Sequence, residues 1–187
     1  YRQVLDLYAT SVDYDPKAAT AREFFKTIQN KMLYAVTSHT AAELVIVRSD
    51  PNHPTIGLTS WPGDRIRKAD TEVSKNYLDE HELDQLNRLT TMFLDFAEYR
   101  ASRHQKTYMA EWAVQTDRFL SFNERAVLTG AGRVSHDNAK RIVHGRYDQF
   151  DAARRTREAA EADEAELDDL DSLPALERRA RHPKEQS

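Results

Sequence analysis

The sequence contains no cysteine, only five glycines and no long apolar run, and each of these absences excludes a class of protein. Without cysteine there is no disulfide scaffold, no thiol nucleophile and no zinc or iron–sulfur site with cysteine ligands. The scarcity of glycine, together with abundant alanine, leucine, glutamate and arginine, favours helices. No apolar run approaches the ~20 residues that a membrane span needs. No signal peptide opens the chain, so we expect a cytoplasmic protein that does not contact a membrane.

The charge balance and the length limit the possible partners and architecture. The 27 lysines and arginines are outnumbered by 31 aspartates and glutamates, which gives a net charge of −4. This balance argues against a whole domain that grips nucleic acid, although a local basic patch remains compatible with it. With 187 residues, of which 40% are hydrophobic, the chain is long enough for one core. We therefore predict an all-α fold, a single compact helical domain of about six to seven helices.

Apolar periodicity and capping residues locate these helices. We expect them over residues 1–9, 16–37, 40–50, 71–77, 80–103, 107–120 and 121–130, with a last helix that begins after Ser135. In the second, Phe25, Ile28, Met32 and Val36 form one apolar stripe. In the helix over 80–103 the inward seam consists of Leu83, Leu86, Thr90, Phe93, Leu94 and Ala97. Capping boxes are predicted at Thr40–Glu43 and Ser121–Glu124.

Two segments depart from this helical pattern. Residues 50–69 form one long irregular loop with three prolines and two glycines, and a loop of this length inside a compact domain usually has a function. After about residue 150 the sequence becomes polar and charge-mixed. We therefore divide the chain into a helical domain, 1–150, and a charged helical extension with a disordered tail, 151–187.

Five stretches, in order and with characteristic spacing, resemble one bacterial family. They are YATSVDYDP at 8–16, NKMLYAVTSHTAAELVIVRSD at 30–50, GLTSWPGDRIRKADTEVSKNYL at 57–78, ELDQLNRLTTMFLDFAE at 82–98 and FLSFNERAVLTGAGRVSHDNA at 119–139. Together they are similar to the bacterial virulence RhuM family over roughly residues 1–150. The resemblance implies an additional N-terminal region like a DNA-binding helix-turn-helix domain, which is missing here. It implies no catalytic residue.

The most concentrated polar group lies between residues 39 and 50. His39 and Glu43 are four residues apart and, with Asp50, are our candidate catalytic residues for acid–base chemistry. The alternative is that Glu43 only completes the capping box of Thr40. His53 and Asp70 offer further metal ligands, but sequence spacing does not show a site. We therefore predict no metal ligands, and the sequence leaves any cofactor open.

A second group surrounds the long loop and combines positive charge with aromatic rings. Such a combination suits phosphate groups or single-stranded nucleic acid. Our candidate binding residues are Arg48, Trp61, Arg65, Arg67, Lys68, Lys75, Asn76 and Tyr77. The alternatives are that Trp61 anchors the loop to the core, that the cations form a solvated surface and that Asn76 caps a helix.

Two hypotheses follow. The first is a helical interaction, oligomerisation or regulatory module that binds a protein partner or a second copy of itself. It predicts a large exposed apolar patch. The second is a small effector enzyme for a phosphorylated or nucleic-acid substrate, with His39 as acid or base, cationic clamps from Arg48 and 65–68, and Asp50 as base or metal ligand. It predicts that these residues meet in one cleft. Nucleic acid would bind through the basic patch or through the missing N-terminal domain.

Overall fold

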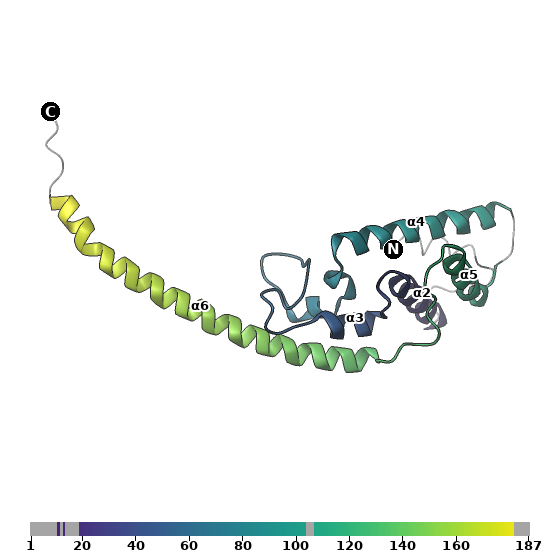
Figure 1. Cartoon of the computed structure of the whole chain (residues 1–187), viewed down its shortest axis with the longest axis horizontal. Coiled ribbons are helices and arrows are strands. Elements are labelled where there is room, and N and C mark those ends of the chain that lie inside the picture. The colour runs from purple at the N-terminus through teal and green to yellow at the C-terminus, as the bar shows by residue number, and fades with distance from the viewer. Residues whose placement is uncertain (1–10, 12, 14–18, 104–106, 182–187) are drawn as a thin grey trace, which may run out of the picture.

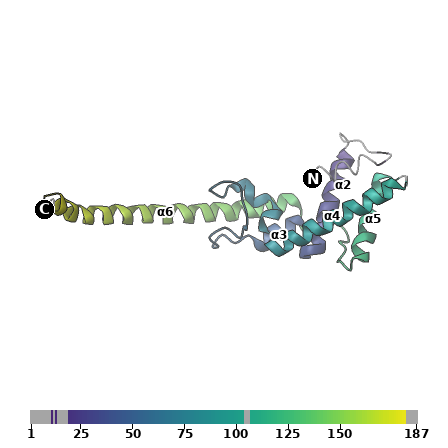
Figure 2. The same cartoon turned by 90° about the horizontal axis from the view of Figure 1, so that it is seen from above.

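The computed structural model describes residues 11, 13, 19–103 and 107–181, and in this part of the chain the fold is all-α, as predicted. It contains α2 (Ala19–Thr37), α3 (Ala41–Arg48), the 3₁₀ helices η1 (Lys68–Glu72) and η2 (Ser74–Tyr77), α4 (Glu80–Ser102), α5 (Met109–Phe122) and α6 (His136–Arg181). The helix predicted over 1–9 lies outside the described residues. Helices α2, α4 and α5 gather at one end of the molecule, and α6 projects from the other end (Figures 1 and 2).

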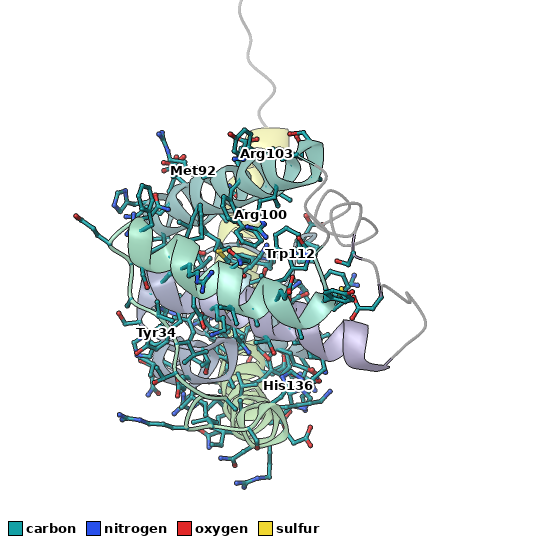
Figure 3. The ribbon with its side chains drawn as sticks, turned by 90° about the vertical axis from the view of Figure 1, so that its right-hand side faces the viewer. Tyr34, Met92, Arg100, Arg103, Trp112 and His136 are labelled. Carbon is teal, nitrogen blue, oxygen red and sulfur yellow. The ribbon has the colours of Figure 1, made fainter. Side chains whose placement is uncertain are left out.

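The main core lies between α2, α4 and α5. Ile28 and Met32 of α2 are buried, which confirms the predicted apolar stripe. Phe93 of α4 packs edge-on against Trp112 of α5, with ring centroids 6.1 Å apart. Figure 3 shows Trp112 inside the domain, where its indole Nε1 donates a hydrogen bond of 2.9 Å to Ser11 Oγ. Aromatic rings thus hold α5 onto α4.

A second core lies beneath the long loop and joins it to α3 and α6. Ile56 and Leu58 of the loop are buried against Tyr77 of η2 and Val143 of α6. Gly57 has a φ of 86°, and an added Cβ would lie 2.0 Å from the carbonyl oxygen of Arg48. Only glycine fits here, because the turn requires a left-handed backbone in contact with the end of α3. The loop therefore packs against α3, η2 and α6 as part of the domain.

Helix ends are satisfied largely as the sequence predicts. Thr40 and Glu43 form a capping box at the start of α3, and Asn138 N donates to Ser135 Oγ at the start of α6. The other end of α3 receives a partner from far along the chain. The guanidinium of Arg146 donates hydrogen bonds of 2.7 Å to both the carbonyl oxygen and the hydroxyl of Ser49. A cation at a helix C-terminus is favoured by the helix dipole.

The helix predicted over 121–130 is absent, because Ser121 belongs to the last turn of α5. Asn123 caps that helix, and its side-chain amide donates a 2.8 Å hydrogen bond to the carbonyl oxygen of Phe119. Glu124 then adopts a left-handed φ of 55°, which a helix cannot continue.

The segment predicted as one short helix over 71–77 also differs. It consists of η1 and η2, and Asp70 lies inside η1, where its carboxylate accepts the N–H of Arg67 at 2.7 Å. This hydrogen bond closes the first turn of a helical segment that begins at Lys68, before the predicted start at residue 71. The prediction of the helix boundary was therefore wrong by one turn.

Helix α6 extends well beyond the domain, as Figures 1 and 2 show. It runs without interruption to Arg181 and so includes most of the segment 151–187, for which we expected a helical extension followed by a disordered tail. Ion pairs within the helix support the segment that leaves the domain, among them Arg155 with Asp151 at 2.8 Å. Within the described part of the chain, no helix combines the length and the apolar character needed to cross a bilayer.

Candidate functional site

The predicted catalytic residues are all engaged in local structure. Glu43 accepts the N–H of Thr40 at 2.9 Å and the N–H of Arg133 at 2.7 Å, so its carboxylate ties a distant loop to the start of α3. These hydrogen bonds, that from Thr40 first, lower the pKa of Glu43. The half-buried His39 ring lies 2.7 Å from the carbonyl oxygen of Thr37. Asp50 accepts the N–H of Asn52 at 2.9 Å in a turn.

Arg48 is the most tightly held of the predicted binding residues. Its guanidinium donates two hydrogen bonds of 2.5 Å to the carboxylate of Glu82, and a third of 2.7 Å to the carbonyl oxygen of Tyr77. These bonds join α3 to η2 and the first turn of α4. The hydrogen bond with Glu82 raises the pKa of Arg48 and lowers that of Glu82. The guanidinium of Arg48 therefore donates its hydrogen bonds to groups of its own chain.

The basic cluster of the loop faces α6. Arg65 lies 3.8 Å from Glu158, and Lys68 lies 2.5 Å from Asp148. The Lys68 ammonium also lies over the Tyr147 ring, 5.8 Å from its centroid. Both pairs are exposed to solvent, so each contributes little to stability. Thus two of the three cationic side chains between residues 65 and 68 form ion pairs with acidic side chains of α6.

The remaining candidates secure the loop or lie at its surface. Trp61 packs against the second core, in agreement with the alternative that it anchors the loop. Asn76 donates to the carbonyl oxygen of Asp70 at 2.9 Å. The buried Tyr77 hydroxyl donates to the carbonyl oxygen of Thr71 at 3.0 Å, and burial raises its pKa. Arg67 and Lys75 are exposed.

These residues do not share either of two hollows on the domain surface. The smaller, of about 60 Å³, lies between α3, η1 and α6. Beside it Glu72 binds Lys140 at 2.9 Å and His144 at 2.7 Å. The pKa of Glu72 is lowered by these hydrogen bonds, mainly that from Lys140. This cluster fastens η1 to α6, and its members satisfy one another.

The larger hollow, of about 360 Å³, opens between α4 and α5. These helices lie toward the end of the molecule opposite to the projecting part of α6 (Figure 1). The lining of the hollow is mostly apolar. The residues that line it are Met92, Asp95, Phe96, Phe119, Phe122 and Asn123. We call these residues the α4–α5 face and include with them Tyr99, one turn after Asp95 on α4, and Arg118, one turn before Phe122 on α5.

Three large apolar side chains of the α4–α5 face are exposed to solvent. The exposed fractions are 88% for Phe122, 62% for Tyr99 and 46% for Met92. Met92 lies at the outer side of α4 in Figure 3. Phe96 and Phe119 form the floor, with ring centroids 5.9 Å apart, and Phe119 is buried. Exposed apolar side chains gathered on one surface are a feature that large protein-binding patches share.

Charged residues of opposite sign flank the apolar groups. Asp95 lies on α4 between Met92 and Tyr99, and Arg118 lies on α5 one turn before Phe122. Both are exposed, and neither forms an ion pair with any residue in the described ranges. Asp95 therefore offers an anion at the hollow, and Arg118 offers a cation on α5, one turn before Phe122.

The sequence contained a signal for this face that our residue-level predictions did not use. The α4 pattern assigned the inward seam to residues such as Leu86 and Phe93, which left Met92 and Tyr99 on the polar side of the helix. Phe122 was placed in a capping box instead of at the end of α5. Large apolar residues outside an otherwise complete amphipathic stripe are the signal that identifies the face.

Comparison with known proteins agrees with the resemblance noted in the sequence. A family model described as the virulence protein RhuM family matches residues 1–158. No curated protein and no solved structure matches the chain. The matched residues include every helix of the domain and the first half of α6. Because the match spans most of its 187 residues, this chain belongs to the virulence protein RhuM family.

Proposed function

We propose that this chain is a helical interaction module that binds a protein surface through its α4–α5 face. The observation that carries the proposal is Phe122, an aromatic side chain that is 88% exposed at the edge of an apolar hollow. Burying a phenylalanine contributes about 1.5–3 kcal/mol, and aromatic residues are enriched where proteins meet. The interaction hypothesis requires such a patch, and the patch supports it.

The alternative, a small effector enzyme, needs the predicted polar residues for chemistry. Glu43, Arg48 and Asp50 instead accept or donate hydrogen bonds that hold helix ends and turns together. The catalytic assignment remains a prediction, and no specific contact favours it. The same holds for nucleic acid, because Arg65 and Lys68 are paired with acidic residues of α6.

The position of the face suits an interaction module. The α4–α5 face lies at one end of the molecule, while the charged part of α6 leaves the other end (Figure 1). The projecting part of α6 therefore points away from a partner bound between α4 and α5. We propose that α6 acts as a spacer between the module and other parts of an assembly. Ion pairs between successive turns support its helix.

Site-specific photo-crosslinking in the cells that naturally carry this protein tests the proposal. A photoreactive phenylalanine analogue replaces Phe122, and the control places it at Leu167, which is 64% exposed on α6. We expect protein crosslinks from position 122 in clear excess over those from position 167. Equal yields at the two positions would contradict the proposed function.

A further inference from the structure

We infer that the protein surface that covers the α4–α5 face is the same face of a second copy of this chain. The inference rests on the proposed function and names its partner. In a twofold interface one patch meets itself, so the patch must contain both members of every contact it makes. The α4–α5 face meets this requirement in shape and in charge.

The shape provides a projection and a recess side by side. Phe122 projects into solvent with 88% of its surface exposed, and the hollow next to it measures about 360 Å³. The floor of that hollow is made by Phe96 and Phe119. A twofold rotation that brings Phe122 of each copy over the hollow of the other buries both rings against aromatic partners.

The charges complete the same arrangement. Asp95 lines the hollow from α4, and Arg118 lies on α5 one turn before the lining residue Phe122. Neither has an ion-pair partner among the described residues. When α4 of one copy lies over α5 of the other, Asp95 faces Arg118 twice, once on each side of the axis. Opposite charges at matching positions set the register of an interface and exclude wrong partners.

A charge exchange between copies tests this geometry. In Asp95→Arg both groups are cationic, and in Arg118→Asp both are anionic, so each variant alone presents like charges across the axis. Mixing the two variants restores two attractive pairs in the heterodimer. We expect the parent to be a dimer by light scattering, each single variant to show a dissociation constant roughly tenfold or more higher, and the equimolar mixture to regain the parent's behaviour.

Two further variants control for the fold and for the place of the contact. Phe122→Ser removes the projection and should give a monomer with unchanged helical content by circular dichroism. Leu167→Ser removes an apolar side chain of α6 that is 64% exposed and should leave the dimer intact.

The outcomes separate this inference from the proposed function. A parent that stays monomeric at all concentrations overturns the inference, and crosslinks from position 122 to a different protein would then leave the proposed function standing. A dimer that survives Phe122→Ser and both charge variants also overturns it, since the contact would lie elsewhere. Loss in each single variant with recovery in the mixture supports it.

Discussion

Arg48 at the end of α3 and Glu82 in the first turn of α4 are joined by two hydrogen bonds of 2.5 Å. The same carboxylate accepts the N–H of Asp79 at 3.1 Å and so completes the cap of α4. The ion pair thus supports the cap at the start of α4 and holds α3 against α4. Arg48 was predicted from the sequence as a phosphate ligand, and this contact gives it a structural alternative that can be measured.

Replacing Arg48 should destabilise the domain. We expect Arg48→Ala to lower the free energy of unfolding by about 1–3 kcal/mol, because Glu82 loses its partner while only 16% of its side chain is exposed. Arg88→Ala is the matched control, since Arg88 pairs with Asp84 at an exposed site and should contribute under about 0.5 kcal/mol. Urea unfolding measures both. Equal losses would mean that the Arg48 contact is not specially stabilising.

Replacing Glu43 should make the stability difference from the parent depend on pH. Its pKa in the folded chain is below the ordinary value of 4.5, so its contribution is present above that pH and is lost as the pH falls through the folded pKa. We expect Glu43→Gln to be less stable than the parent by about 1 kcal/mol at pH 7 and to approach the parent below pH 4.5.

The measurement is the urea midpoint of both proteins across this pH range. Glu164→Gln, on the exposed part of α6, is the control and should match the parent at every pH. A difference for Glu43→Gln that stays constant down to pH 3 would exclude the carboxylate as its source.

Adding a methyl group at Gly57 should disrupt the long loop far more than at Gly63. Both residues have positive φ, 86° and 75°, so alanine at either position should cost about 1 kcal/mol of backbone strain. At Gly57 the new Cβ also meets the carbonyl oxygen of Arg48 at 2.0 Å, whereas nothing lies within 4 Å at Gly63. Thermal melts of the two variants compare them directly, and similar melting temperatures would argue against a packed loop.

Phe122 should be dispensable for folding. Because it is 88% exposed, we expect Phe122→Ser to change the stability of the monomer by no more than about 0.5 kcal/mol. Phe93→Ala, at a ring that is 1% exposed in the main core, should cost about 3–5 kcal/mol. Chemical unfolding at low protein concentration gives both values. A large loss at Phe122 would assign that ring to the fold and not to an interaction.

Sequence reasoning succeeded where structure is set by neighbours along the chain. The capping box of Thr40 and Glu43, the cap at Ser135 and the stripe through Ile28 and Met32 depend on residues three or four positions apart, and all are confirmed. The all-α class follows from the same local signals. The box predicted at Ser121 failed because α5 was already helical there and ended at the cap of Asn123.

The candidate site could not be located in this way, because its contacts join distant parts of the chain. Nothing near Lys68 in the sequence indicates that Asp148 neutralises it, or that Arg48 meets Glu82. The pattern of α4 marks Met92 and Tyr99 as apolar residues outside the inward seam, but the hollow itself forms only where rings of α4 and α5 pack together. Leu83, predicted to be in the inward seam, is 40% exposed, whereas Leu86, three residues later, is buried.

The most direct test of the account asks whether the α4–α5 face is covered when copies meet. The chain has no cysteine, so Met92→Cys places a single thiol beside the hollow and Leu167→Cys places one on α6. The rate at which each thiol reacts with a labelling reagent is measured over a wide range of protein concentration. The account predicts that the reaction at position 92 slows as concentration rises while the rate at position 167 stays constant. Rates that are independent of concentration at both positions would contradict self-association through this face.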